Sequence, residues 1–321
     1  MKAALLPDRG VIKLAGDATR NFLHGLVTAD ILTLAPATAR FTALLTPQGK
    51  IIADFFVAEA AQQGEFGSAF FLDVPRALGA TLTQKLNLYK LRAKVTVEDK
   101  SAALGVLAAW NESANGGGEA SDGQDAAQMH AMKIGLCYAD PRLPALGLRA
   151  IIPLERAAQA AAELGAALTD STAYDTHRIA LGIPQGGVDF VYSDAFPHET
   201  DMDQLGGVDF KKGCFVGQEV VSRMQHRGTA RTRAVPVRFE GQAPESGTAI
   251  TAGGRPVGTL GSAGGGRGIA SLRLDRVEEA FAEGGTLSAG TVPIHLVKPD
   301  WARFPFPGEK AQEKAQETPD R

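Results

Sequence analysis

Cys214 lies in the segment of this 321-residue chain whose residue types are best suited to chemistry. It follows Lys211 and Lys212 and precedes what reads as the start of a helix, and Gly213 and Gly217 leave little side-chain bulk around the sulfur. Nearby cations and the positive end of a helix dipole both favour a thiolate. We therefore expect the pKa of the thiol to fall below its free value of about 8.5. Such a cysteine can act as a nucleophile, a metal ligand or a redox switch.

The residues after this cysteine have the pattern of an amphipathic helix. Apolar residues recur every four positions from 216 to 224, and Glu219 lies one turn before Arg223, the favourable order for an ion pair. The alternative for Cys214 is a small buried apolar residue, the usual position of a free cysteine. The adjacent lysines and glycines favour the functional interpretation over burial.

Charged residues on both sides of Cys214 allow further interpretations. The segment 196–203 holds one imidazole and three carboxylates, but its spacing matches no defined metal-binding loop, so we predict no stably bound metal. The basic residues form either a solvated helix face or a site for an anionic ligand tail or a phosphate backbone. The net charge of −3 favours the compact ligand. This basic set comprises Lys211, Lys212, Arg223, Arg227, Arg231 and Arg233.

Asp54 is a second candidate for chemistry. It lies between Ala53 and Phe55 in an expected strand, and a carboxylate among apolar neighbours often has a raised pKa and a functional role. The alternative is a strand side chain that faces water. The histidines lie far apart in the sequence, and nothing in their positions marks a partner for Cys214.

Several segments have patterns that predict helices, strands and turns. Residues 41–45 and 51–57 are apolar and β-prone, and residues 46–50 between them have the composition of a tight turn, so we expect a hairpin. From about Arg231 the chain has short strands separated by glycine-rich turns, which predicts a barrel or sandwich that ends near Lys298. Other expected elements are a helix from an Asp17 N-cap to Leu26, strands at 11–14, 70–74 and around 95–97, a helix from Pro75, a helix at 154–164 and a flexible loop at 115–128.

The composition limits the class of protein. A hydrophobic share of 44% supports real cores, and two cysteines at distant positions, Cys137 and Cys214, form no disulfide framework. A pI near 6.1 argues against direct binding of nucleic acid or of an anionic membrane over the whole surface. The N-terminal residues resemble neither a signal nor a transit peptide, and no apolar run reaches transmembrane length. We expect a cytoplasmic protein.

Four motifs together resemble the YgfZ branch of the folate-binding proteins related to glycine-cleavage T-protein. The most specific is Lys-Gly-Cys-Phe-Val-Gly-Gln-Glu at residues 212–219. The others are Gly-Asp-Ala-Thr-Arg-Asn-Phe-Leu-His-Gly at 16–25, Leu-Thr-Pro-Gln-Gly-Lys at 45–50 and Arg-Ile-Ala-Leu-Gly-Ile-Pro at 178–184. The resemblance covers nearly the whole chain, and the mitochondrial iron–sulfur assembly factor of this family looks similar through the same region.

The resemblance implies an α+β fold in which three domains form a ring around a central channel. The implied domains are a discontinuous folate-binding α+β domain (1–96 and 170–230), a ferredoxin-like middle domain (97–169) and a C-terminal β-barrel (231–300), followed by a disordered tail (301–321). The implied cofactor is tetrahydrofolate or another reduced folate. The implied function is assembly or repair of iron–sulfur clusters for client enzymes, including radical enzymes that thiomethylate transfer RNA.

The alternative function is that of a tetrahydrofolate-dependent aminomethyltransferase. Asp54 retains the position of the transferase carboxylate that lies near the reacting folate nitrogen. Arg149 replaces a glutamate that grips the pterin, and Tyr174 replaces an arginine. Replacing an acceptor with a donor in a buried hydrogen-bonding site usually costs a few kcal/mol, and the transferase lacks the cysteine motif. The resemblance therefore favours the cluster-assembly function, with catalytic turnover as the alternative.

The resemblance also assigns roles to candidate residues. Cys214 is the expected reactive group, activated by Lys211 and Lys212, and Asp54 is expected to contact the folate nitrogen. Arg149 and Arg223 are candidates for the anionic glutamate tail of the folate, and Gln218 and Glu219 for orienting the loop or a ligand. Two further hypotheses are a scaffold that docks a partner through its basic helix, and a thiolate that shares a transient cluster with the cysteines of a partner.

Overall fold

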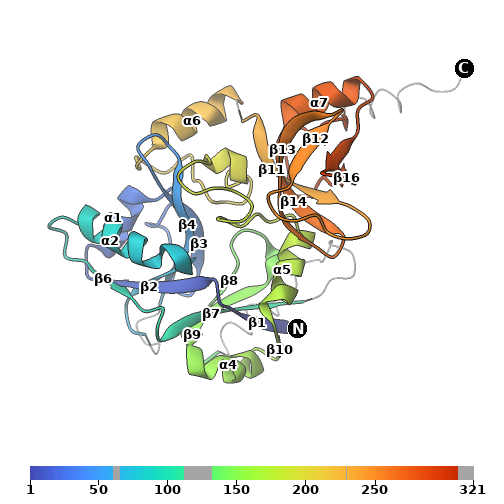
Figure 1. The fold of residues 1–321 in the computed structure, drawn as a ribbon. Helices are drawn as coiled ribbons and strands as arrows, with labels where there is room; N and C mark the ends of the chain where they lie inside the picture. Colours follow the sequence, from blue (N-terminus) through green and yellow to red (C-terminus); the bar gives the residue numbers. More distant parts are fainter. Residues whose placement is uncertain (61–65, 112–131, 229, 310–321) are drawn as a thin grey trace, which may run out of the picture.

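The chain forms two five-stranded sheets and a closed barrel (Figure 1). The computed structural model describes residues 1–60, 66–111, 132–228 and 230–309. The expected loop at 115–128 lies outside the described residues. The α+β class and the C-terminal barrel predicted from the sequence are confirmed.

The first sheet contains the predicted hairpin. Its strand order is β3-β4-β5-β2-β6, and β3 (Ala39–Leu45) and β4 (Ile51–Glu59) are antiparallel. The turn between them closes with a hydrogen bond from the amide of Thr46 to the carbonyl oxygen of Lys50 (2.8 Å). The remaining elements of this unit are β2 (Arg9–Ala15), α1 (Thr19–Leu26), β5 (Phe70–Pro75), η1 (Arg76–Leu78), α2 (Gly79–Tyr89) and β6 (Thr96–Asp99).

The N-cap of α1 differs from the predicted one. The cap residue is Ala18, whose side chain has no oxygen to accept an amide hydrogen bond, so Asp17 is not the cap. The second predicted helix is confirmed, because α2 buries Leu82 and Leu86 on one stripe. Both helices pack on the outer face of the first sheet in one apolar cluster.

The second sheet contains the N-terminal strand of the chain. Its order is β10-β1-β7-β9-β8, with β1 (Lys2–Leu6) antiparallel to β7 (Leu104–Trp110) and parallel to β10 (Ala167–Thr169). The predicted domain boundary is therefore wrong at residues 1–6, because both edges of β1 are hydrogen-bonded within the middle unit. The other elements of this unit are β8 (Leu136–Ala139), η2 (Pro144–Leu146), β9 (Leu148–Pro153), η3 (Leu154–Arg156) and α4 (Ala157–Glu163).

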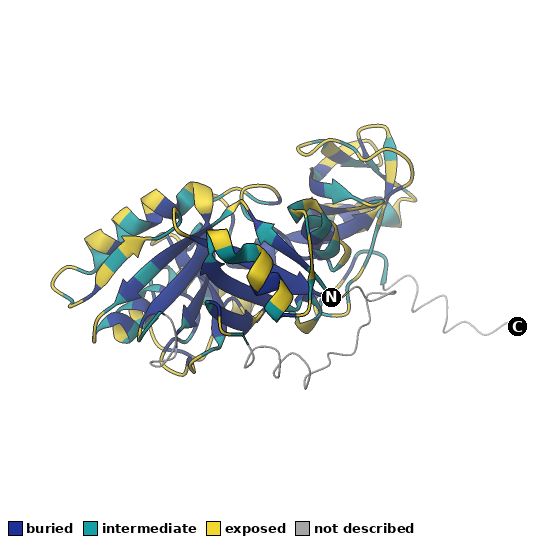
Figure 2. Cartoon of the chain, turned by 90° about the horizontal axis from the view of Figure 1, so that it is seen from below, coloured by how far each residue is buried: buried dark blue, intermediate teal, exposed yellow. Residues whose placement is uncertain are grey.

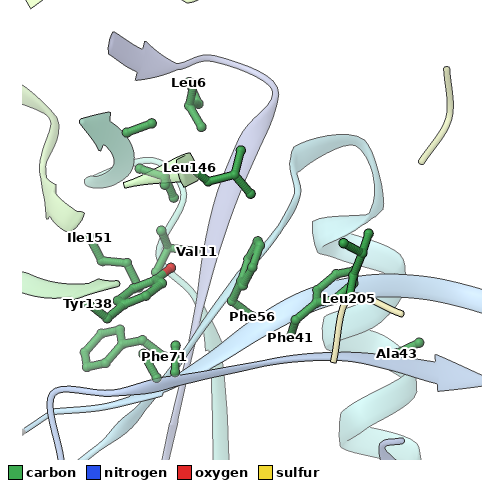
Figure 3. Packing of buried hydrophobic residues seen from close by; sticks show 14 of the residues in the cluster. Leu6, Val11, Phe41, Ala43, Phe56, Phe71, Tyr138, Leu146, Ile151 and Leu205 are labelled. Atoms are coloured by element: carbon green, nitrogen blue, oxygen red, sulfur yellow. The ribbon is translucent and has the colours of Figure 1, made fainter. Parts of the chain in front are cut away.

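The two sheets pack face to face and share one core. Figure 3 shows Phe41 and Phe56 of the first sheet beside Tyr138 and Ile151 of the second, all members of a single buried cluster. The outer face of the second sheet is covered by α4, so the layers run helix, sheet, sheet, helix. Figure 2 shows the strands mostly buried and the helices exposed on their outer sides.

The segment from α5 to α6 connects the second sheet to the barrel. It contains α5 (Ser171–Ala180), a short 3₁₀ helix η4 (Pro197–Thr200) and α6 (Gln218–Arg227). In α5, Arg178 donates hydrogen bonds to Asp189 (3.1 Å) and, on the barrel, to Ser262 Oγ (2.7 Å). These contacts tie α5 to the barrel.

The barrel closes in the order β11-β14-β13-β12-β15-β16. Ala302, Phe304 and Phe306 are buried against its apolar cluster. The prediction that the chain is disordered from residue 301 is therefore wrong, because these side chains cover apolar surface of the barrel. Residues 310–321 lie outside the described part of the chain. The barrel elements are β11 (Thr232–Arg238), β12 (Ala249–Ala252), β13 (Arg255–Gly264), β14 (Arg267–Arg273), α7 (Leu274–Ala282), β15 (Leu287–Ala289) and β16 (Val292–Leu296). Within the described residues, no helix combines the length and the apolar character needed to cross a membrane.

Candidate functional site

Cys214 is exposed on a loop that lies against the turn of the first hairpin. Gly217, the N-cap of α6, has φ of +80°, and a Cβ at that position would lie 2.5 Å from the carbonyl oxygen of Thr46. Only glycine adopts this conformation at this distance without strain. The cysteine motif and the Pro-Gln-Gly-Lys turn, which are far apart in the sequence, therefore form one surface.

Lys212 anchors the cysteine loop to α1. Its side chain is buried, and its ammonium donates to the carbonyl oxygens of His24 (2.5 Å) and Val27 (2.6 Å) at the C-terminal end of α1. Burial lowers the pKa of Lys212 to about 8. The amides of Lys211 and Lys212 both donate to Asp209 Oδ1, at 2.7 and 3.1 Å. Lys212 therefore holds the loop in place, whereas Lys211 is exposed to solvent.

The helix after the cysteine is confirmed, but it begins later than the sequence suggested. Its first residue is Gln218, four residues after Cys214, and the effect of a helix dipole is confined to about one turn. Glu219 and Arg223 form the predicted ion pair (2.6 Å), and both side chains are exposed. Gly213 has no heavy atom within 4 Å of the position of a Cβ, so the approach to the loop is open.

The acidic segment before the cysteine binds an arginine of the barrel. Arg233 donates to Asp203 (2.6 Å), to Asp201 (3.2 Å) and to the carbonyl oxygen of His198 (2.7 Å). Burial raises the pKa of Asp201 well above its usual value. These carboxylates fix the barrel to the segment between α5 and α6.

Asp54 lies in a different place, in a narrow cavity between the sheets and α5. The hydroxyl of Tyr192 donates to Asp54 Oδ1 (2.5 Å), and burial raises the pKa of Tyr192 above its usual value. This contact requires Gly186, because a Cβ there would lie 2.0 Å from the tyrosine oxygen. Asp54 does not face open water; Tyr192 covers it.

The other two residues predicted beside Asp54, Arg149 and Tyr174, do line this cavity. Arg149 donates from Nε (2.8 Å) and Nη2 (2.6 Å) to Asp73 Oδ2, and from Nη1 to the hydroxyl of Tyr174 (3.1 Å). Asp73 also accepts from Arg9 Nε (2.6 Å) and from the hydroxyl of Tyr138 (3.1 Å). The donor groups of Arg149 are therefore used within the protein.

Asp73 is the centre of this network and was not singled out from the sequence. Burial alone would raise its pKa, but the charges of Arg149 and Arg9 outweigh burial and hold the pKa below its usual value. Asp73 lies between apolar residues in β5, the same signal that marked Asp54, so the sequence did contain a sign of it. Tyr192 had no comparable signal.

The residues around Asp54, as arranged here, do not fit a pterin. The cavity offers about 40 Å³, whereas a cavity of about 150 Å³ accommodates a single benzene ring. The guanidinium of Arg149 lies 4.5 Å from the centre of the Phe56 ring, and that of Arg142 lies 4.9 Å from it. The space beside Asp54 is thus largely filled by side chains of the chain itself.

The predicted site residues therefore separate into two places. Asp54, Arg149 and Tyr174 lie at the cavity, whereas the cysteine loop and α6 lie beyond the hairpin turn, and none of their residues lines the cavity. The second group comprises Lys211, Lys212, Gly213, Cys214, Gly217, Gln218, Glu219 and Arg223. A single ligand that bridges Arg149 and Arg223 is not supported by this arrangement.

The fold is similar to that of a solved aminomethyltransferase. The glycine cleavage system aminomethyltransferase T from Bartonella henselae has a similar structure, with a TM-score of 0.68 over 95% of this chain and 87% of that chain, at 14% identity. At this identity the likeness shows the fold alone. The family described as the CAF17 C-terminal β-barrel domain matches residues 231–304.

The sequence relatives define the family. The human iron–sulfur cluster assembly factor IBA57, mitochondrial, is 30% identical over 309 residues, which cover 92% of this chain and 84% of that protein. The homologue from Mycosarcoma maydis is 32% identical, over an alignment that covers 74% of this chain and 57% of the homologue. The homologue from Neurospora crassa is also 32% identical, over 75% of this chain and 54% of the homologue. The chain belongs to the IBA57 family, and it spans little more than half the length of these fungal relatives.

Proposed function

We propose that this chain acts in iron–sulfur cluster assembly, and that Cys214 supplies one thiolate ligand to a cluster shared transiently with a partner protein. The observation that carries the proposal is an exposed cysteine on a loop that the rest of the fold holds in place. Lys212 fixes the loop to α1, and Gly217 fits it against the hairpin turn. The names of the relatives, which are iron–sulfur cluster assembly factors, support the same process.

The cluster has to be shared, because its usual ligands are four cysteines and the chain has two. Cys137 is buried in the second sheet, away from solvent. Among the described residues, no group of three or more His, Cys, Asp and Glu side chains is placed to hold a metal ion. The remaining ligands would therefore come from cysteines of the partner.

Turnover of a folate is not part of this proposal. An aminomethyltransferase needs space for the pterin beside Asp54, and the cavity offers about 40 Å³. The family resemblance predicts a reduced folate, but the filled cavity argues against a pterin beside Asp54, and a binding measurement decides between the two.

The proposal also predicts which enzymes depend on this protein. Radical enzymes that contain iron–sulfur clusters, such as those that thiomethylate transfer RNA, would lose activity without this protein. The relatives are named as mitochondrial proteins, and a cytoplasmic location of this chain stays a prediction.

Two measurements test the proposal. In a bacterial strain that lacks its own family member, the wild type should restore the activity of an iron–sulfur enzyme, and Cys214→Ala should not; Cys137→Ala is the control. In vitro, the purified chain should be colourless, and a mixture with an iron–sulfur carrier protein should become brown only when Cys214 is present. Rescue by Cys214→Ala would reject Cys214 as a cluster ligand and favour a scaffold role. If well-folded wild type does not rescue the strain, the role in iron–sulfur cluster assembly is rejected.

A further inference from the structure

Positive charge is concentrated around the cysteine loop. Residues 209–231, which include the Asp209 carboxylate that holds the loop, contain five lysines and arginines and two acidic residues, a net +3, so the rest of a chain with a net charge of −3 carries −6. A segment with a net positive charge attracts anions nearby, even though the molecule as a whole is negatively charged.

Four of the five cations are available to a partner. Lys212 is buried and bound to carbonyl oxygens of α1, but the other four, which we call the basic rim, are exposed. Lys211 and Arg227 have no ion-pair partner among the residues that the structure describes, and the exposed pair of Arg223 with Glu219 neutralises only one of the four charges. The basic rim consists of Lys211, Arg223, Arg227 and Arg231.

Helix stability alone does not explain the basic rim. Arg227 lies in the last turn of α6, where a cation is favoured by about 0.3–1 kcal/mol, and its repulsion with Arg223 one turn before costs about 0.2–0.5 kcal/mol. Lys211 and Arg231 lie outside the helix, so its stability does not account for them. A solvated helix face would gain from further acid–base pairs of the Glu219–Arg223 kind. With a rise of about 1.5 Å per residue, Arg223 and Arg227 lie within one to two Debye lengths, about 10 Å each at 0.1 M salt, of the start of α6. Near 0.01 M salt, where the Debye length is about 30 Å, an ion near the cysteine loop feels both charges, whereas at 0.1 M salt the charge of Arg227 is largely screened.

We infer that the basic rim is the docking surface for an acidic face of the partner that supplies the remaining cysteines. The inference rests on the proposed function, because Cys214 lies beside this rim and has to meet a partner thiolate. Opposite charges on the two faces would accelerate encounter and orient the partner. Phe210, 38% exposed and four residues before Cys214, offers an apolar contact within the same loop.

Thiol–disulfide exchange with charged peptides tests the surface without a known partner. Three five-residue peptides carry a central cysteine activated as the mixed disulfide with thionitrobenzoate and flanked by four glutamates, four lysines or four glycines. The Cys214 thiolate attacks the peptide sulfur, the new disulfide forms, and thionitrobenzoate leaves with the electron pair and is measured by its absorbance. Cys214→Ser gives the background rate.

The wild type should react at least about tenfold faster with the acidic than with the glycine peptide at low salt, and slower with the basic peptide. The preference should disappear near 1 M salt, where the Debye length is about 3 Å. Lys211→Glu/Arg227→Glu should abolish or invert it, whereas Arg238→Glu/Arg255→Glu, two exposed barrel positions, should preserve it. Iodoacetamide is uncharged, so its rate measures the reactivity of the thiol itself, and each peptide rate is divided by it to remove any change in the thiolate fraction of a variant.

Equal rates for the three peptides, or an equal loss in the barrel control, would overturn the inference. Protection of Cys214 by single-stranded polyuridine, but not by polyglutamate, would assign the basic rim to nucleic acid instead. The brown mixed complex separates the two proposals. If it forms equally well with Lys211→Glu/Arg227→Glu, the docking surface is wrong and the cluster ligand stands; if it never forms although the peptide preference is intact, the cluster ligand is wrong.

Discussion

The ammonium of Lys212 donates to the carbonyl oxygen of Val27 at 2.6 Å, across 185 positions of sequence. The contact places a cation at the C-terminal end of α1, where unpaired carbonyl oxygens favour positive charge. The same ammonium donates to the carbonyl oxygen of His24 (2.5 Å), so the motif at 16–25 and the motif at 212–219 meet at Lys212. The position of the cysteine loop therefore depends on α1, and the ammonium of Lys212 holds the loop rather than activating the thiol of Cys214.

Replacing Lys212 should destabilise the protein and free the cysteine loop. Lys212→Met leaves the carbonyl oxygens of His24 and Val27 without their donor, a loss of about 1–3 kcal/mol. The free energy of unfolding in urea measures this loss. Lys211→Met, the exposed neighbour, should change it by less than about 0.5 kcal/mol; similar losses for both lysines would contradict the anchoring role.

Two glycines of similar backbone conformation should respond differently to alanine. Gly217 has φ of +80° and a Cβ position 2.5 Å from Thr46 O, whereas Gly228 has φ of +58° and nothing within 4 Å. Gly228→Ala should cost only the left-handed conformation, about 1–2 kcal/mol. Gly217→Ala should cost more and displace the loop, so it should also fail to rescue the bacterial strain. Equal thermal stability of the two variants would show that the loop does not depend on contact with the hairpin turn.

Removal of the charge on Asp73 should be among the costly substitutions in the core. Asp73→Asn removes the ion-pair partner of Arg9 and leaves the buried Arg149 only the more distant Asp140 (3.7 Å), and breaking a buried pair in this way costs about 3–5 kcal/mol. Asp194→Asn is the matched control, because its ion pair with Lys50 (2.6 Å) has a carboxylate that is 77% exposed. The control should lose less than about 1 kcal/mol in the same urea titration.

The Asp73 network should also appear in the pH dependence of stability. The pKa of Asp73 is lower in the folded chain than its ordinary value. Its contribution is therefore complete above an unfolded pKa of about 3.9 and is lost as the pH falls through the folded pKa. The difference in free energy of unfolding between wild type and Asp73→Asn should be constant near neutral pH and narrow below about pH 4. A difference that narrows between neutral pH and pH 5 would point to another group.

The cavity beside Asp54 makes a prediction about folate. Isothermal titration with 5-formyltetrahydrofolate should give no saturable heat with the wild type, because the cavity beside Asp54 offers only about 40 Å³ and Arg149 and Arg142 pack on Phe56 within it. A glycine-cleavage aminomethyltransferase is the positive control. Saturable binding that Asp54→Ala abolishes would show that this network opens to admit the ligand.

Local patterns in the sequence were sufficient for the elements near Cys214. The hairpin, the helix and the Glu219–Arg223 pair depend on residues that lie within a few positions of one another, so periodicity and turn composition predicted them. The barrel also followed from short strands and glycine turns. The predicted start of the helix, the Asp17 cap and the assignment of residues 1–6 to the first domain were wrong, because cap geometry and strand partners depend on the surrounding tertiary structure.

By itself, the sequence determined which residue types are present and which local elements carry them: a cysteine in a glycine-rich loop before a basic helix, and carboxylates in apolar strands. Only the tertiary structure decided what each charge contacts. Asp73 meets Arg149 across 76 positions and Tyr192 meets Asp54 across 138. A buried charge has to find a partner, but the pattern of a strand or helix does not say which distant residue it will be. Folding assigned Arg149 to Asp73 and Lys212 to α1, and left Cys214 exposed at the surface.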